Sequence, residues 1–217
     1  MQRKFWPLLV ALMILLTGLG WLRVSIFKEK EQNVIAELQA GQSPSSIQFF
    51  QTISDYGKYI NLGIPALFLV MGLVMRKNDF ARKGLLILLA MGLSGIISQS
   101  IKRTLKEPRP YEVDSRITQW SVGGSNSFPS GHTAEVTAAT LGFTIILFRT
   151  PLSILLSVVW ALLMMFSRIV LGVHNFTDIL GGIVVGCLGI LVMQKIFDRL
   201  WKADQNALQK KTPKSSN

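Results

Sequence analysis

Long apolar blocks separated by short charged stretches dominate the hydropathy pattern of this chain. Six blocks approach the ~20 residues that an α-helix needs to cross a hydrocarbon core of ~30 Å. They cover residues 5–27, 59–75, 84–101, 133–148, 152–173 and 179–197. Their apolar residues are grouped and do not recur at the spacing of an amphipathic surface helix. The pattern predicts an all-α, polytopic membrane protein with a six-transmembrane-helix bundle.

The first and fourth blocks need separate arguments. Arg3 and Lys4 precede the first block, as in a signal peptide, but no small-x-small cleavage pattern follows Leu22. We therefore expect a retained membrane anchor. The fourth block contains Glu135 near its start and reaches a spanning length when it is extended back to Ser130.

The composition combines a high net charge with few charged residues. The 217 residues include 23 Lys and Arg against 12 Asp and Glu, a net charge of +11, yet only 16% are charged. A soluble nucleic-acid-binding domain usually has more charges than the ~25% of an average globular chain. We therefore expect no nucleic-acid partner. The single cysteine, Cys187, lies in the last block and excludes an intramolecular disulfide.

Basic residues in short loops predict the orientation of the bundle. Most of them fall on one side: Arg3, Lys4, Arg76, Lys77, Arg82, Lys83, Arg149, Lys195, Arg199, Lys202, Lys210, Lys211 and Lys214. Both termini are therefore predicted to be cytoplasmic. The opposite side receives residues 28–58, residues 102–131 and the turn around His174.

The segment 28–58 is too polar to span a membrane. Apolar residues nevertheless recur there at helical spacing, at Ile47, Phe50, Ile53, Tyr56 and Ile60. A helix packed over the bundle and an interfacial helix that admits lipid explain this pattern equally well. The tail 203–217 is polar and rich in lysine, so we expect it to be disordered. The remaining chain, 1–202, is predicted to be one membrane domain.

Three polar clusters lie at the predicted non-cytoplasmic ends of the spans. The first covers 102–110, the second covers 127–132, and the third covers 167–178 between the fifth and sixth spans. Because the parity of the spans places all three at the same membrane face, we expect them to form one site. Both histidines of the chain, His132 and His174, belong to these clusters.

The clusters contain groups that suit phosphate. Lys102, Arg109 and Arg168 supply cations, and guanidinium groups can bind phosphate oxygens in a bidentate way. Ser130 and Gly131 lie where a loop turns into a helix, so backbone N–H groups and the positive end of the helix dipole can face an anion. Arg168 interrupts an apolar run, so it should face protein or a wet cavity.

The histidines and Asp178 suit phosphoryl transfer. His174 and Asp178 are four residues apart, so they share a helical face if the sixth span begins near His174. A carboxylate on one imidazole nitrogen fixes the tautomer and leaves the other nitrogen free as a nucleophile. His132 would then protonate the leaving group. No cluster resembles a metal site, so we expect no metal and no other cofactor.

Neighbouring polar residues have simpler explanations. Arg103, Lys106 and Arg116 are expected to reach lipid headgroups, as basic residues at helix ends commonly do. Glu135, one turn after His132, could tune that histidine, but we expect it to cap the start of the helix.

Three spaced motifs run through the clusters: Lys102-x6-Arg109-Pro110, Pro129-Ser130-Gly131-His132, and Ser167-Arg168-x5-His174-x3-Asp178. In order and spacing they resemble the type 2 phosphatidic acid phosphatase superfamily, which also contains bacterial acid phosphatases and vanadium haloperoxidases. The resemblance covers roughly residues 59–197.

The resemblance implies a role for each matched residue. His174 would form a phosphohistidine, Asp178 would orient it, and His132 would protonate the leaving group. The residues implied to bind phosphate are Lys102, Arg109, Ser130, Gly131 and Arg168. Membrane members of the superfamily are six-helix enzymes with the site at the outer leaflet.

These observations predict a lipid phosphatase of a bacterial inner membrane, with its site facing the periplasm. The first substrate we expect is undecaprenyl diphosphate, and the alternatives are phosphatidylglycerophosphate, phosphatidate or lipid A phosphates. A phosphotransferase, or a protein that binds or transports phospholipids without cleaving them, is also possible. Residues 28–58 and 111–126 are expected to set specificity, with Phe49, Phe50 and Trp120 for lipid chains and Arg116 for a second phosphate.

Overall fold

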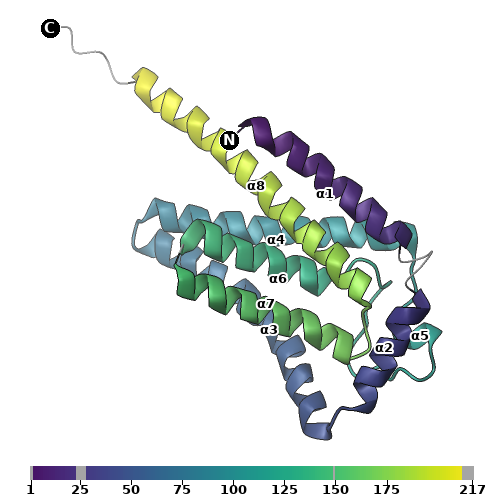
Figure 1. Ribbon diagram of the computed structural model, residues 1–217. Helices are drawn as coiled ribbons and strands as arrows, with labels where there is room; N and C mark the ends of the chain where they lie inside the picture. The colour runs from purple at the N-terminus through teal and green to yellow at the C-terminus, as the bar shows by residue number, and fades with distance from the viewer. Residues whose placement is uncertain (1, 23–27, 149, 212–217) are drawn as a thin grey trace, which may run out of the picture.

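The structure is a computed structural model that describes residues 2–22, 28–148 and 150–211. The described residues are helical or irregular, which confirms the all-α prediction (Figure 1). The helices are α1 (Gln2–Leu22), α2 (Lys28–Ala40), α3 (Pro44–Val74), α4 (Asn78–Leu105), α5 (Pro110–Val113), α6 (Gly131–Gly142), α7 (Pro151–Val170) and α8 (Phe176–Lys211). A π-helical turn, η2 (Phe143–Leu147), continues α6.

Within the described residues, four helical stretches are long and apolar enough to cross a membrane. They are Pro44–Val74, Asn78–Val113, Pro151–Val170 and Phe176–Trp201. They contain the second, third, fifth and sixth predicted spans almost completely. In α1 the described residues include a shorter apolar stretch, Val10–Gly20, and α6 has 12 residues before the π-helical turn. The count of six spans therefore stays a prediction.

Some residues used in the sequence predictions lie outside the described part. They are residues 23–27 of the first predicted span, Arg149, and residues 212–217 of the predicted tail. Helix α8 ends at Lys211, so it continues through residues 203–211, where the composition suggested disorder.

The polar segment 28–58 folds as two helices instead of one. Helix α2 packs on the bundle and buries Gln32 and Ile35, among others. The rest of the segment is the first half of α3, which begins after the N-cap Ser43, whose hydroxyl accepts a hydrogen bond from the Ser46 amide at 3.2 Å. Helix α3 then runs without a break into the second predicted span, so the polar and apolar parts form one long helix.

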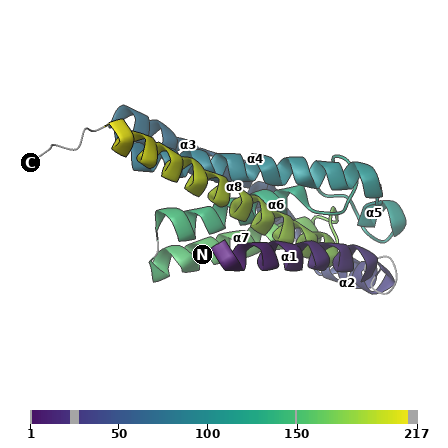
Figure 2. The same cartoon turned by 90° about the horizontal axis from the view of Figure 1, so that it is seen from above.

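Helix α8 lies along α1, α4 and α6 (Figures 1 and 2). Glycines on α8 allow this close contact. A Cβ atom at Gly182 would lie 2.6 Å from the Ser130 carbonyl oxygen, and one at Gly186 would lie 2.6 Å from the Ala134 carbonyl oxygen. This packing fixes the start of α6 against the start of α8, where two of the polar clusters lie.

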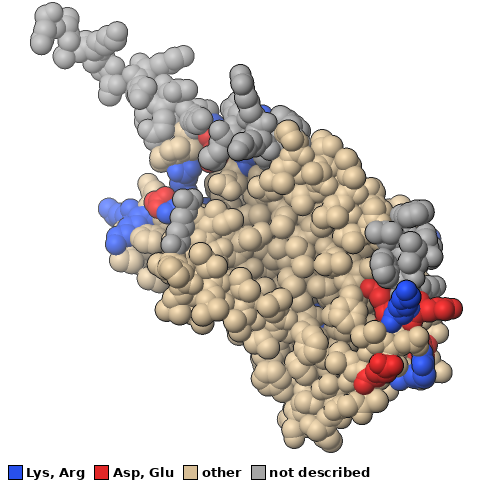
Figure 3. Space-filling model, in the orientation of Figure 1, with Lys and Arg blue, Asp and Glu red and all other residues tan. Residues whose placement is uncertain are grey.

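Charged side chains gather at two opposite ends of the molecule. In Figure 3, the surface between the two ends is almost free of Lys, Arg, Asp and Glu. Exposed side chains along α3 and α7, such as Leu67, Val74 and Leu155, are large and apolar. An uncharged belt between two charged rims is the surface that a lipid bilayer requires.

Candidate phosphate site

The three polar clusters meet at one end of the bundle, as the span parity predicted. The C-terminal ends of α4 and α7 and the N-terminal ends of α6 and α8 lie there, together with the loop between α5 and α6 (Figure 1). Backbone hydrogen bonds join the clusters: Ser130 N donates to Asp178 O at 2.9 Å, and Ser127 N donates to Glu107 O at 2.8 Å. Residues 48 and 20 positions apart in the sequence are therefore held in one site.

His174 and Asp178 form a buried pair. The His174 Nδ1 atom lies 3.3 Å from Asp178 Oδ2, and the exposed fractions of the two side chains are 2% and 0%. Asp178 Oδ2 also accepts hydrogen bonds from Ser127 Oγ at 2.5 Å and from the Asn175 amide at 2.8 Å. The predicted pairing is confirmed, although α8 begins at Phe176 and His174 lies in the preceding turn.

The turn before α8 fixes the orientation of His174. Gly172 has a positive φ of 72°, a backbone angle that residues other than glycine rarely adopt. The amides of Val173 and His174 both donate to the Arg168 carbonyl at 3.2 Å. The imidazole is thus attached to the end of α7 through its backbone and to the start of α8 through Asp178.

Burial keeps the His174 imidazole neutral. Burial lowers the pKa of His174 well below its ordinary value, and the hydrogen bond with Asp178 opposes this effect only in part. With Nδ1 directed at the carboxylate, Nε2 is left as the unprotonated nitrogen. Nε2 lies 3.5 Å from Arg109 Nη1, so an electrophile bound beside that guanidinium would meet it.

Arg109 and Lys102 are held by backbone carbonyls of the site loops. Arg109 donates to Val173 O at 2.6 Å and to Ser125 O at 2.8 Å. Lys102 Nζ donates to Asn126 O at 2.5 Å and to Ser127 O at 3.2 Å. Both side chains are buried. The carbonyls therefore hold two positively charged side chains next to His174, in positions that are fixed before a ligand binds.

Arg168 approaches from α7. Its Nη1 donates to Ser54 Oγ and to Ser121 Oγ, the latter at 3.2 Å, and its Nη2 donates to Val122 O at 3.3 Å. Its buried Nε has no hydrogen-bond partner within the described part of the chain. A buried donor without a partner is costly, and a bound anion would satisfy it.

The start of α6 completes the site. Ser130 is the N-cap, and its hydroxyl accepts from the Thr133 amide at 3.4 Å and from Thr133 Oγ1 at 2.9 Å. Space beside Gly131 is open, since a Cβ atom there would meet nothing within 4 Å. His132 follows and is half-buried. The expectation that Glu135 caps this helix is wrong, because Ser130 has that role.

Helix α2 supplies contacts that the motifs did not indicate. Glu31 is buried and accepts two hydrogen bonds from Thr177, at 2.7 Å from its amide and at 2.9 Å from its hydroxyl. Gln39 bonds both backbone groups of Thr118 and also Val170 O at 2.9 Å. Glu31 thus holds the start of α8 beside Asp178. The only feature of the sequence that pointed to these contacts was the polar composition of residues 28–58.

In residues 111–126, which were expected to set specificity, Arg116 does not have the expected role. This side chain pairs with Asp114 at 2.6 Å and donates to Asn33 Oδ1 at 2.6 Å, and its hydrogen bonds lower the pKa of Asp114. Its guanidinium therefore links the loop to α2 and is not left available for a second phosphate. Trp120 is half-buried and its carbonyl accepts from Gln51 Nε2 at 2.8 Å.

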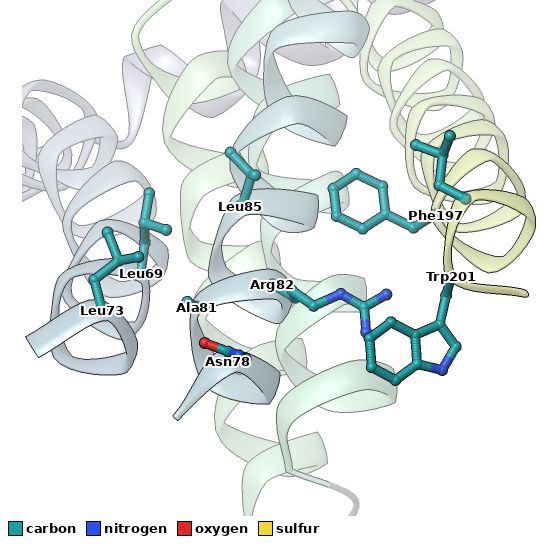
Figure 4. Close-up of a pocket in the computed structure, with 9 residues that line it drawn as sticks. Leu69, Leu73, Asn78, Ala81, Arg82, Leu85, Phe197 and Trp201 are labelled. Carbon is teal, nitrogen blue, oxygen red and sulfur yellow. The ribbon is translucent and has the colours of Figure 1, made fainter. Parts of the chain in front are cut away.

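The opposite end of the bundle has a pocket of a different kind. It has a volume of about 540 Å³ and lies between α4 and α8, with Leu69 and Leu73 of α3 at its edge (Figure 4). Its walls are mostly apolar, and Arg82 stacks on Trp201 at 3.6 Å from the ring centroid. Among the described residues that line it, Arg82 is the one charged side chain and none is a nucleophile or an acid. Within the described residues, no three His, Cys, Asp or Glu side chains are grouped as metal ligands.

The chain is similar to known proteins in sequence and in fold. The model of the PAP2 superfamily matches residues 83–202. The chain is 30% identical over 172 residues to lipid A 4'-phosphatase of Porphyromonas gingivalis, which covers 74% of this chain and 70% of the relative.

Two solved structures share the fold. A transmembrane PAP2 type phosphatidylglycerolphosphate phosphatase from Bacillus subtilis superposes with a TM-score of 0.73 at 21% identity, over 88% of this chain and 96% of that one. LpxE of Aquifex aeolicus superposes with a TM-score of 0.59 at 21% identity, over 75% and 93%.

Proposed function

Because the chain is a membrane lipid phosphatase of the PAP2 superfamily, we propose that it hydrolyses a lipid phosphomonoester through a phosphohistidine at His174. One observation carries the proposal. The unprotonated Nε2 of His174 faces Arg109, while Nδ1 is held by the buried Asp178. A nucleophile is thereby oriented beside the place where cations would hold a phosphate.

The proposed reaction has two steps. Nε2 of His174 attacks phosphorus, the P–N bond forms, and the P–O bond to the lipid breaks while His132 gives its proton to the leaving alkoxide. Water then attacks the phosphohistidine, His132 takes a proton from it, and the P–N bond breaks to release inorganic phosphate. Asp178 stabilises the positive charge that His174 carries between the two steps.

Cations and amides would hold the phosphate oxygens. Lys102, Arg109 and Arg168 are buried, so their charges act in a medium that screens them little. The Nε of Arg168, which has no hydrogen-bond partner among the described residues, is a donor available to one oxygen. Ser130 and Gly131 add the N-terminal end of α6, where the Gly131 amide would face the phosphate and the Ser130 amide already donates to the Asp178 carbonyl.

The relatives favour a phosphorylated acyl lipid over a polyprenyl diphosphate. Those described above are named for lipid A and for phosphatidylglycerolphosphate. Undecaprenyl diphosphate, the first expectation from the sequence, gains no support from them. We therefore propose a phosphatidylglycerolphosphate, phosphatidate or lipid A phosphatase.

We also propose the predicted topology, with six spans, both termini in the cytoplasm and the site at the periplasmic face of a bacterial inner membrane. The uncharged belt in Figure 3 and the four long apolar stretches support the bundle. The basic residues of the α3–α4 turn, Arg76 and Lys77, lie at the end away from the site, as the positive-inside rule requires.

Phosphate release from a lipid panel tests the proposal. Purified protein is given phosphatidylglycerolphosphate, phosphatidate, lipid A and undecaprenyl diphosphate, with and without EDTA, and His174→Ala serves as the blank. We expect release from at least one acyl lipid and none from the blank. Binding without release from any lipid would contradict the proposal and favour a carrier. Labelled phosphate that appears on a second lipid would favour a phosphotransferase.

A further inference from the structure

A second pocket, near the phosphate site, has no part in the proposed chemistry. It has a volume of about 270 Å³ and lies between α3, the α6–η2 helix and α7. Most of its lining is apolar, including Ile64, Pro65, Phe143 and Leu156. It lies among the apolar spans, beyond the polar clusters.

The residue spacings on three helices all place this pocket at the same distance from the phosphate site along the bundle. On α3, Asn61 of the pocket follows Ser54 of the site by seven residues. On α6, Ala139 follows His132 by seven, and on α7, Trp160 precedes Arg168 by eight. At ~1.5 Å per residue, each interval is about 11 Å, or two helical turns. The pocket therefore lies two turns from the site, toward the middle of the bundle.

A row of residues on each of two helices leads from the site to the pocket. Ser54, Lys58, Asn61 and Pro65 share one face of α3, and His132, Glu135, Ala139 and Phe143 share one face of the α6–η2 helix, since spacings of three and four residues align. Lys58 interacts electrostatically with both His132 and Glu135. The two rows therefore face each other between the site and the pocket.

The other route, between α3 and α7, is closed. Gly57 packs directly on Met164, which lies between Arg168 and Trp160 and is buried. Below that contact, Trp160 Nε1 donates to Asn61 Oδ1 at 2.8 Å. The α3–α6 face is therefore the side along which a chain bound at the phosphate site would reach the pocket.

We propose that this pocket is the subsite for an acyl chain of the lipid whose phosphate is cleaved. The inference rests on the proposed function, since it needs a lipid phosphate bound at His174. Lys58 and Glu135 would flank the polar linker between the phosphate and the chain, and the apolar walls would hold the hydrocarbon. The occupant is the substrate's own chain, because the rows on α3 and α6 that begin at the phosphate site end at this pocket.

Chain-length dependence tests this subsite. Leu156→Trp fills the pocket, and Leu155→Trp is the matched control, since the two leucines are 60% and 59% exposed and only Leu156 lines the pocket. Hydrolysis of dihexanoyl and dipalmitoyl phosphatidate is measured in mixed micelles. We expect Leu156→Trp to lower the long-chain to short-chain ratio of kcat/KM by about tenfold or more, through KM for the long chain. Leu155→Trp should keep the wild-type ratio.

The outcomes separate this inference from the proposed function. If the wild type hydrolyses both lipids and Leu156→Trp keeps the wild-type ratio, the subsite is wrong while the phosphatase stands. If the wild type hydrolyses neither lipid, nor any other lipid phosphate, the proposed function itself fails. Should Leu156→Trp also lose short-chain activity, Ile64→Trp fills the pocket from α3, with Leu67→Trp as its control. An unchanged ratio there would overturn the subsite.

Discussion

The two ends of the bundle both contain arginines, but in opposite environments. At the site end, Arg109 and Arg168 are 3% and 2% exposed and their guanidinium groups are held by loop carbonyls and serine hydroxyls. At the other end, Arg82 is half-buried and stacks on Trp201 (Figure 4). A buried cation is costly unless a partner anion compensates it. Among the described residues, the buried arginines lie at the site end, in agreement with the anion site proposed there.

The lysines show the same contrast. Lys102 is 5% exposed and points into the loop carbonyls of the site. Lys83, near the other end of the same helix, is 32% exposed and pairs with Asp79 at 2.7 Å. An exposed pair of this kind contributes little to stability. The lysines at the two ends of α4 therefore lie in different environments, as the proposed phosphate binding at one end and membrane orientation at the other require.

The largest effect should follow from removing the nucleophile. We expect His174→Ala to lower the rate of phosphate release by at least about 10³-fold, because no neighbouring group replaces Nε2. Arg82→Ala, at the other end, should leave the rate within about twofold of the wild type. Folding is checked by thermal unfolding in detergent. Equal losses in the two variants would remove the distinction between the ends.

A smaller loss is expected when the geometry of one buried cation changes. Arg168→Lys keeps the charge but removes Nε, the donor without a partner, and the planar fork. We expect kcat/KM to fall about 10²-fold, in line with the loss of one preorganised donor. The same substitution at the stacked arginine, Arg82→Lys, is the control. Wild-type kcat/KM in Arg168→Lys would contradict phosphate binding by Arg168.

Next in size is the contact between α2 and α8. Glu31→Ala removes both hydrogen bonds to Thr177, and we expect the free energy of unfolding to fall by about 1–2 kcal/mol. Since Asp178 follows Thr177, kcat should fall about tenfold with little change in KM. Glu31→Gln, which keeps an acceptor, should restore most of kcat. Glu29→Ala, exposed on the same helix, should have no effect; equal effects at both positions would reject a positioning role.

The smallest effect concerns pH. The pKa of His174 is lowered by burial, so its imidazole stays unprotonated, and nucleophilic, below the ordinary histidine pKa of ~6.5. The acidic limb of kcat/KM, which reports the free enzyme, should therefore have its midpoint below pH 6.5. Activity is lost as pH falls through that midpoint. A midpoint above pH 7 in the wild type would contradict a neutral, buried His174.

The motifs were sufficient to predict which residues lie together at the centre of the candidate site. Fixed spacings, such as the four residues from His174 to Asp178, specify a contact within one turn, and span parity brought distant clusters to one face. The hydropathy blocks located most of the long helices for a similar reason, since a membrane segment is defined by local composition.

Contacts between distant polar residues could not be predicted in the same way. Glu31 and Ser54 lie in a segment whose composition shows only that it does not span, and their partners, Thr177 and Arg168, are over a hundred positions away. Packing decides such contacts, and a single sequence carries no signal for them. Arg116 illustrates the opposite error. Its positive charge suggested a ligand for a second phosphate, but it pairs with Asp114, a neighbour in the sequence.

Trapping the phosphorylated intermediate tests the central claim most directly. The enzyme is mixed with a 32P-labelled lipid phosphate, quenched within milliseconds in base, digested, and the labelled peptide is sequenced. A phosphohistidine is stable in base and unstable in acid. We predict one acid-labile label, located on His174 and absent from His174→Ala. A label on His132, or turnover in His174→Ala at the wild-type rate, would contradict the account.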